Sequence, residues 1–348
     1  MEFPQVDLSI IIVSWNVCSL LRRCLASIFA CASSDPESDS TWYLAESDLT
    51  SAGGGYRFEV LVINSASRDA SVTMVRREFP GVRLYDSQVN LGYAQGNNLG
   101  IEKSLGQYVL LLNPDTEMVG DALVKMLGYM HTHPDVGVLG PQLRWPSGSV
   151  QSSRRRFPSL GTAFAEGTFV QRWFPDHPAL KRFYCVDQPD DGVSEVDWVT
   201  GACLLVRRQA IDQVGKLDES FFMYSEELDW QKRIRLGGWK IIYCSSAQVI
   251  HHEGKSSEQV VVARHIWFQS SKVRYYRKHH GRCVGEIVRW WLLFTDLYEW
   301  GIEAIKFCLG HKRQLRRERM RAYQQALRSR LDESFARELG RERSNGAS

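Results

Sequence analysis

The carboxylates of this 348-residue chain gather at two places where their types and spacing could support chemistry. Asp115 ends the stretch YVLLLNPD, in which an uninterrupted apolar run leads directly into Asn113 and Pro114. A short apolar run of this composition predicts a strand buried on both faces, which would place the carboxylate at the strand tip. A carboxylate so placed could bind a ligand, although Asn, Pro and Asp are also common turn residues.

The second group of carboxylates is denser. Glu226, Glu227 and Asp229 place three acids within four residues, in the stretch SEELDW. Negative charge is stabilising at a helix N-terminus, so a purely structural role is one explanation. Three carboxylates exceed what a helix start requires, and we therefore predict that this group is functional.

Two further clusters carry groups that bind anions or metals. Arg154, Arg155 and Arg156 could hold phosphates through bidentate hydrogen bonds, or could form a solvated basic turn. His251 and His252 end another apolar run, where a solvated pair is the alternative to a functional one.

Alternating strand-like and helix-like segments are predicted to position these groups. Strands are predicted at 8–15, 58–64, 82–87 and 108–113, and helices at 17–31, 70–79 and 94–104. Such alternation implies a parallel sheet covered by helices, with ligands bound beyond the carboxyl ends of the strands. Polar residues stand at three of those ends: Ser14 and Asn16, Asn64 and Ser65, and Asn113 and Asp115.

The remaining segments are less regular. Residues 33–56 are polar and rich in Ser, Asp and Gly, which predicts an inserted surface loop. Residues 196–208 predict a strand.

Composition and charge exclude some classes of protein. The net charge of +3 is too small to indicate a nucleic-acid partner, and the basic surplus lies in the tail, where residues 311–348 hold eleven Lys/Arg and five Asp/Glu. The eight cysteines show no metal-binding spacing and predict mostly buried free thiols in a reducing compartment. We expect no signal peptide, and no membrane span, because no uncharged apolar run reaches about eighteen residues.

The order of the motifs resembles the inverting family-2 glycosyltransferases with a GT-A fold, in particular the bacterial rhamnosyltransferase-like group. The matching stretches are IIIVSWN, VLVINSASRDAS, NLGYAQGNNLGI, LLLNPDTE, RRRFPS, TGACLLVRR, GKLDESFFMYSEELDW and VIHHEGKSS. The resemblance implies an α/β fold with a mixed, mostly parallel sheet, helices on both faces and C-terminal amphipathic helices. We expect a glycosyltransferase domain over 1–280, with a donor-binding half (1–117) and an acceptor-binding half (118–280), and a helical extension over 281–348.

The resemblance also implies roles for the acidic residues and histidines. Asp115 would bind a divalent metal, Mg²⁺ or Mn²⁺, that holds the diphosphate of a nucleoside-diphosphate sugar, with Asn113 beside it. His252, in the matching histidine pair, would supply a further contact to the metal or diphosphate. Glu227 takes the position of the general base that activates an acceptor hydroxyl, and Asp229 is included among the catalytic residues.

The donor site implied by the same resemblance draws on several segments. Its candidate residues are Ser14, Asn16, Asn64, Asp69, Asn90, Gly92, Asn97, Asn113 and Arg155. The family commonly has Asp-Asn where this chain has Asn64 and Ser65, and Gly where it has Ala70. An Asn side chain can accept a hydrogen bond from a base N–H but can also donate one, so the identity of the base stays open. Asp69 is also a candidate helix N-cap.

Residues 287–309 predict an amphipathic helix whose polar residues share one stripe. A wide apolar face with three tryptophans, followed by the basic stretch HKRQLRRERMR, predicts peripheral membrane contact through 287–321, on the cytoplasmic face of the cell membrane. A helix that covers the core or forms a dimer contact is the alternative.

The predicted partners are therefore a nucleoside-diphosphate sugar and a glycan or lipid-linked acceptor, with rhamnose as the sugar. A non-catalytic sugar-nucleotide-binding or scaffold protein of the same fold is the second hypothesis. A nucleotidyltransferase is the third, although SWNVCSLLRR has none of the glycines of a phosphate loop.

Overall fold

The computed structural model describes residues 6–35, 38–44, 55–252, 261–332, 334–335 and 338–339. The end of the predicted VIHHEGKSS motif, from residue 253, and the last residues of the tail lie outside this range. Contacts divide the chain into two compact units: Met1–Arg156, Gln188–Asp218 and Glu227–Ser256 form the first, and Phe157–Asp187, Glu219–Glu226 and Ser257–Ser348 form the second. The predicted assignment of 1–117 to the donor, 118–280 to the acceptor and 281–348 to an extension stays a prediction.

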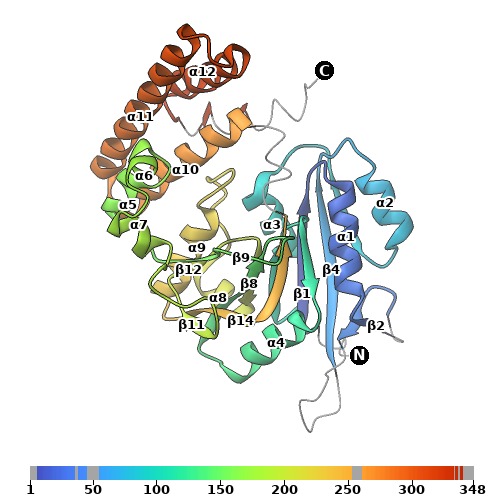
Figure 1. The fold of residues 1–348 in the computed structure, drawn as a ribbon. Helices are drawn as coiled ribbons and strands as arrows, with labels where there is room; N and C mark the ends of the chain where they lie inside the picture. Colours follow the sequence, from blue (N-terminus) through green and yellow to red (C-terminus); the bar gives the residue numbers. More distant parts are fainter. Residues whose placement is uncertain are drawn as a thin grey trace. The chain divides into compact units, whose positions relative to one another are not determined.

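A mixed sheet is the centre of the first unit (Figure 1). Its strand order among the described residues is β11-β14-β8-β13-β6-β1-β4-β3-β2, with β5 on β4, β7 on β14 and β9 on β8, and β10 pairs with β12 separately. The strands are β1 (Leu8–Ser14), β2 (Ala32–Ser34), β3 (Trp42–Leu44), β4 (Tyr56–Ser65), β5 (Arg83–Ser87), β6 (Tyr108–Leu112), β7 (Thr116–Val119), β8 (Val136–Arg144), β9 (Val150–Gln151), β10 (Arg154–Arg155), β11 (Val193–Glu195), β12 (Trp198–Val199), β13 (Cys203–Arg207) and β14 (Lys240–His251).

The mixed α/β sheet of the prediction is confirmed, although its parallel part is smaller than predicted. Strands β5, β4, β1 and β6 run parallel, as do β8 and β14. The second half of the sequence adds antiparallel strands, because β13 pairs antiparallel with both β6 and β8. The single strand predicted over 196–208 is divided into β12 and β13 by a turn.

Alternation along the strands produces two apolar layers, one on each face of the sheet. The helices of this unit are α1 (Cys18–Phe29), α2 (Ser71–Glu78), α3 (Gly92–Lys103), α4 (Ala122–Thr132), α8 (Arg208–Val214) and α9 (Glu226–Leu236). Leu8, Ile10 and Ile12 of β1 pack with buried residues of α1, α2 and α4. Ile11 points the other way and packs with residues of α3, α8 and α9. Helices on both faces were predicted, and this is confirmed.

The prediction of a surface loop over 33–56 is wrong at two places. Residues 32–34 and 42–44 form the short strands β2 and β3, which extend the sheet antiparallel from β4. The aromatic ring of Trp42 accounts for this, since it lies 4.7 Å from the ring of Phe29 and 5.7 Å from that of Phe58. Residues 45–54 of the predicted loop lie outside the described residues.

The second unit is helical. It consists of α5 (Leu160–Ala165), α6 (Phe169–Trp173), α7 (Pro178–Phe183), α10 (Val261–His280), α11 (Arg282–Cys308) and α12 (Arg313–Ser329). Trp291 of α11 donates a hydrogen bond to the carbonyl of Phe164, and Lys272 of α10 lies 2.9 Å from the carboxylate of Glu166. The short helices α5 to α7 therefore belong with the C-terminal helices, far from them in sequence.

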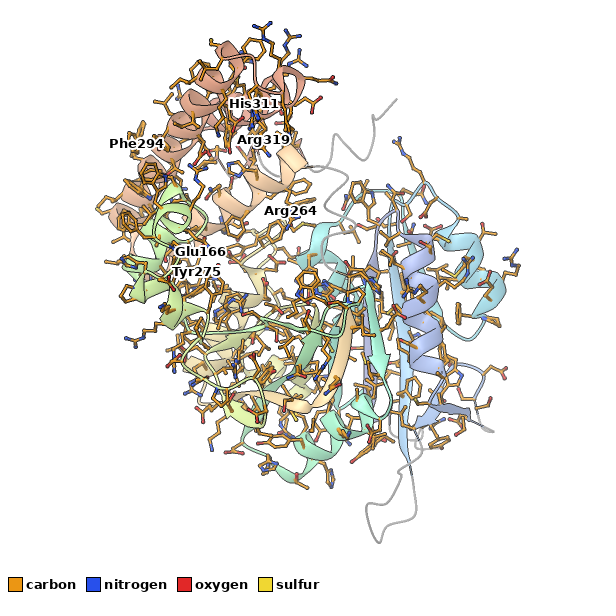
Figure 2. The ribbon with its side chains drawn as sticks, viewed as in Figure 1. Glu166, Arg264, Tyr275, Phe294, His311 and Arg319 are labelled. Atoms are coloured by element: carbon orange, nitrogen blue, oxygen red, sulfur yellow. The ribbon has the colours of Figure 1, made fainter. Side chains whose placement is uncertain are left out.

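Helix α11 is amphipathic as predicted, but its polar stripe faces inward. Asp296, Glu299 and Glu303 are 1%, 8% and 3% exposed, and they pair with His265, Arg172 and Arg316 respectively. The opposite face, which we call the outer face of α11, exposes Ile287, Trp290, Phe294, Leu297 and Ile305, and Leu309 continues it at the C-cap. Phe294 lies on the side of α11 that is turned away from α10 (Figure 2).

All eight cysteines are unpaired, as predicted. Their predicted burial holds for Cys24, Cys185, Cys203 and Cys244, and is wrong for Cys31, Cys283 and Cys308, which are exposed. In the part of the chain that the structure describes, no helix is both long and apolar enough to cross a bilayer.

Candidate active site

Asp115 and His251 come together where β6 ends and β14 finishes. Strand β14 pairs with β7 so that His251 lies opposite Thr116, next to Asp115. His251 Nε2 lies 3.4 Å from Asp115 Oδ1, and both residues are buried, at 8% and 5% exposure. On its other side, His251 Nδ1 lies 3.0 Å from Gln151 Oε1.

The contact with Gln151 orients the His251 ring. An amide oxygen can only accept, so Nδ1 donates in this contact, and in the neutral ring Nε2 then carries the lone pair. Nε2 is buried and has no hydrogen-bond partner among the described residues. A ring nitrogen lone pair and a carboxylate oxygen thus face each other, which is an arrangement that a cation between them would stabilise.

His252, the histidine predicted to contact the metal, is held elsewhere. Its Nε2 lies 2.6 Å from Glu117 Oε1, which also accepts a hydrogen bond from Arg23. Only its backbone touches Asp115, through a bond from His252 N to the Asp115 carbonyl. The structure therefore brings His251, and not the side chain of His252, to Asp115.

Other donors for a metal are few. Among the described residues no group of three or more His, Cys, Asp or Glu side chains gathers as a metal site. Asn113 uses its backbone in the fold, since its N–H donates to Ala202 and its carbonyl accepts from Thr116.

Glu227, the predicted base, lies beside the turn that contains Gly201. A Cβ on Gly201 would be 3.4 Å from Glu227 Cβ, so the bare backbone of Gly201 lies directly against the glutamate. Since Ala202 bonds to Asn113 at the end of β6, Glu227 and Asp115 belong to the same end of the sheet. Glu227 Oε2 is buried without a hydrogen-bond partner among the described residues.

The environment of Glu227 favours its neutral form. Burial raises the pKa of its carboxyl group, while backbone hydrogen bonds from Glu227, Leu228 and Gly201 act in the opposite direction. A carboxylate with a raised pKa is a stronger base once it is ionised, which suits proton abstraction.

Asp229 has a different setting. It is fully buried and accepts a hydrogen bond of 3.0 Å from Arg233, one helical turn on. Arg233 also donates to the carbonyls of Val214 and Lys216. Asp229 thereby anchors α9 to the loop after α8.

Two of the predicted donor-site residues serve the loops between β1, β4 and α2. Asn16, whose φ is 52°, accepts from the Arg68 N–H and donates its own N–H to Ser67. Asp69 accepts from the N–H groups of Cys18 and Ser71, the first residues of α1 and α2. The N-cap position of α2 is Ala70, so Asp69 lies one residue before the N-cap and binds the start of both helices from there.

The loop before α3 is also internally bonded. Asn90 accepts from the N–H of Gly92 and the hydroxyl of Ser65, and Gly92 has a φ of 68° that favours glycine. Asn97 is buried within α3, where its amide donates to the Tyr93 carbonyl. The close approach expected at the glycines of this segment is made to the sheet, since a Cβ on Gly100 would lie 2.3 Å from Ile11.

Ser14 and Asn64 keep buried polar atoms at the strand ends. Ser14 Oγ and Asn64 Oδ1 have no hydrogen-bond partner among the described residues. The Asn64 amide donates to Asp86 Oδ1 at 2.8 Å, a contact that sequence reasoning missed because Asp86 lies on another strand.

The arginine cluster is partly structural. Arg154 is 4% exposed and donates to the Gln188 carbonyl and to Asp190, with its guanidinium 5.0 Å from the Tyr243 ring centroid. Arg155 is half-buried and donates to Ser152. Arg154 therefore fastens the segment after 187 to the sheet.

Comparison with known proteins agrees with this geometry. The family model described as "Glycosyl transferase family 2" matches residues 9–215. An N-acetylglucosaminyl-diphospho-decaprenol L-rhamnosyltransferase of Mycobacterium tuberculosis is 33% identical over 209 residues, which are 57% of this chain and 67% of that protein. The rhamnosyltransferase WbbL of Escherichia coli is 26% identical over 192 residues, 53% of this chain and 69% of that one.

The fold is similar to that of solved glycosyltransferases. The mannosyltransferase PcManGT of Pyrobaculum calidifontis, solved with GDP-Man and Mn²⁺, has a TM-score of 0.50 at 15% identity, and the match covers 94% of this chain and 87% of that one. The predicted GT-A fold type and the predicted enzyme class, a glycosyltransferase that uses a nucleotide sugar, are thereby confirmed. The matched region is more than half of the chain, and it includes Asp115 and Gly201. The chain therefore belongs to glycosyl transferase family 2.

Proposed function

We propose that the enzyme transfers rhamnose, with inversion, from a nucleoside-diphosphate sugar to a hydroxyl of a glycan or lipid-linked saccharide. The observation that carries the proposal is the meeting of Asp115 and His251 at the same sheet edge as Glu227. The rhamnosyltransferases among the relatives support the choice of sugar, and the decaprenol-linked substrate in the name of one of them supports a lipid-linked acceptor.

A divalent metal fits the residues that are present. Asp115 and His251 offer one oxygen and one nitrogen ligand, and His251 is oriented by Gln151 as metal-bound histidines commonly are. Diphosphate oxygens and waters would complete the coordination of Mg²⁺ or Mn²⁺. The metal, when bound, neutralises charge that develops on the leaving diphosphate.

The protein side chains would then carry out a single displacement. The acceptor oxygen forms a bond to the anomeric carbon while the bond from that carbon to the diphosphate oxygen breaks. Glu227 takes the proton of the acceptor hydroxyl during the attack, and the electron pair of the broken bond leaves with the diphosphate. Ser14, Asn64 and Arg155 are the proposed donor contacts that keep polar groups at the strand ends. Asn16, Asp69, Asn90 and Gly92 shape the loops around them, and Asn97 is held within α3.

We further propose that the outer face of α11 contacts the cytoplasmic face of the cell membrane. Trp290 and Phe294 are 64% and 52% exposed, and with Ile287 and Leu297 they follow helical spacing. A Cβ on Gly301, on the same stripe, would meet open space. Contiguous exposed apolar residues of this kind mark an interaction surface.

Charge selects an anionic bilayer as the partner of this face. Residues 311–330 hold eight Lys or Arg and one Glu, and most of these side chains are exposed. Arg313 and Arg317 lie 5.8 and 5.7 Å from the ring centroid of Phe307, so the basic helix α12 adjoins the C-terminal end of α11. Basic residues near a membrane contribute about 1 kcal/mol each toward binding anionic lipid.

Thermal stabilisation by nucleoside-diphosphate sugars, with and without Mn²⁺, tests the enzymatic proposal. We expect a Mn²⁺-dependent shift with a rhamnose donor, and its loss in Asp115→Ala. Asp121→Asn, which removes an exposed carboxylate at the start of α4, is the matched control and should keep the shift. A wild-type protein that is stabilised by no such donor would contradict the proposal.

A further inference from the structure

Asn64 and Asp86 form a pair across two neighbouring strand ends. Strands β4 and β5 run parallel with Asn64 opposite Asp86 in the register. Asn64 is 2% exposed, and its Nδ2 donates to Asp86 Oδ1 at 2.8 Å. The Asp86 side chain is 31% exposed, so the pair joins a buried amide to a carboxylate at the surface.

The carboxylate leaves the amide only one orientation. A carboxylate accepts hydrogen bonds and cannot donate them, so the NH₂ group of Asn64 must face Asp86. Oδ1 of Asn64 must then point the other way, where it is buried and has no hydrogen-bond partner among the described residues. A buried acceptor without a partner is unfavourable, and a ligand N–H at that place would supply the missing hydrogen bond.

We propose that Asp86 fixes Asn64 as a pure acceptor, so that the pair selects nucleobases that present a ring N–H. This inference rests on the proposed function, in which Asn64 is a donor contact, and it assigns the nucleobase as the part of the donor that Asn64 binds. Uracil and thymine carry N3–H and guanine carries N1–H on the pairing edge. Cytosine and adenine carry an unprotonated ring nitrogen there, which would face the Asn64 oxygen as a second acceptor.

The pair also explains why this chain has Asn64 where the family that it resembles commonly has Asp. An aspartate at 64 would place two carboxylates at hydrogen-bonding distance, and like charges so close cannot both ionise easily. With Asp86 on the adjacent strand, an asparagine at 64 keeps the acceptor and removes the repulsion. The amide donor that could have made base recognition ambiguous is occupied by Asp86.

Calorimetric affinities for UDP, thymidine diphosphate, CDP and ADP in the presence of Mn²⁺ test the inference. The wild type should bind the first two more tightly than the last two. In Asp86→Asn the amide of Asn64 is free to turn, so discrimination against CDP should fall about tenfold, the effect of one hydrogen bond. Asn64→Asp should weaken binding of all four nucleotides, and the double variant Asn64→Asp/Asp86→Asn should restore the wild-type order.

The variants separate the possible failures. Arg76→Gln changes a charge 3.7 Å from the Asp86 carboxylate without touching the amide, and should keep the wild-type discrimination. A folded Asp86→Asn protein with unchanged discrimination would overturn the role of Asp86 while leaving the proposed function intact. If the single variants do not fold, the double variant decides, because it retains one amide and one carboxylate; lost discrimination there overturns the inference. A wild type that binds none of the four nucleotides overturns both.

Discussion

At the scale of single residues, the choice between His251 and His252 depends on strand alternation. Consecutive strand residues point to opposite faces, so only one of two adjacent histidines can face Asp115. The sequence predicted the histidine pair and Asp115, but the side of the strand depends on the pairing of β14 with β7. Two residues so far apart in the chain carry no local signal of their register.

His251→Ala should lower the affinity for Mn²⁺ in the presence of a nucleoside diphosphate by at least tenfold, because it removes a proposed ligand. Gln151→Leu should lower the affinity in the same direction by roughly tenfold, the low end of the contribution of outer-shell partners, and by less than His251→Ala does. Manganese binding measured by calorimetry or electron paramagnetic resonance gives a readout independent of turnover. His252→Ala is the matched control, and equal losses in both histidine variants would contradict the assignment of His251.

Glu227→Gln should slow transfer by roughly 10²–10⁴-fold, the usual contribution of a general base, with nearly unchanged donor affinity. The same change should stabilise the fold at neutral pH. Burial raises the pKa of Glu227 above its unfolded value, so the ionised carboxylate is disfavoured in the folded state.

The effect of Glu227 on stability has a defined pH window. Below the ordinary carboxyl pKa of 4.5 the group is neutral in both states, and the Gln variant should unfold at the wild-type temperature. As pH rises through the raised pKa, the wild type should lose stability relative to the variant. Thermal unfolding across this range checks the sign, and a variant that is less stable at neutral pH would refute the account.

At the scale of helices and strands, the sequence predicted periodicity well and orientation poorly. The helix predicted over 94–104 is α3, and the strand predicted over 108–113 is β6, because apolar spacing marks both. The short strand β3 was missed because it has only three residues and lies within a polar segment. In α11 the spacing showed two faces, but His265, Arg172 and Arg316, which bury its acidic face, come from three other helices.

Replacing residues on the outer face of α11 should abolish lipid binding without disturbing the fold. Trp290→Ser/Phe294→Ser/Leu297→Ser removes three exposed side chains, each of which contributes up to roughly 1.5–3 kcal/mol when fully buried. Co-sedimentation with vesicles containing phosphatidylglycerol should fall at least tenfold. Vesicles of phosphatidylcholine alone should bind the wild type weakly, because the basic side chains of α12 then lack anionic partners.

A matched triple replacement controls for general loss of apolar surface. Val89, Leu105 and Leu236 are exposed residues of the first unit, and changing them to serine should leave vesicle binding unchanged. If the wild type shows no preference for anionic vesicles, the outer face of α11 has another partner.

At the scale of the whole molecule, the two units are each assembled from several chain segments. The second unit combines 157–187, 219–226 and 257–348. Composition marked the C-terminal part of this unit, but no local pattern in the aromatic segment after 156 indicated that it packs with helices more than a hundred residues later. Contacts such as Trp291 with Phe164 and Arg172 with Glu299 are long-range, and no periodicity encodes them.

This interleaving predicts the result of removing the C-terminal helices. A chain that ends at His280 loses α11 and α12, and with them the buried partners of α5, α6 and α10. Arg172 would lose Glu299, His265 would lose Asp296, and the carbonyl of Phe164 would lose the Trp291 N–H. Val288, Leu292 and Leu293, which are buried in the full chain, would no longer cover the other helices.

We therefore expect the truncated protein to aggregate or to unfold at a clearly lower temperature, while the α11 triple-serine variant keeps the wild-type unfolding temperature and loses only lipid binding. Thermal unfolding and size-exclusion chromatography distinguish the two proteins. A truncated chain that stays monomeric and unfolds like the wild type would show that α11 serves the membrane alone and does not hold the second unit together.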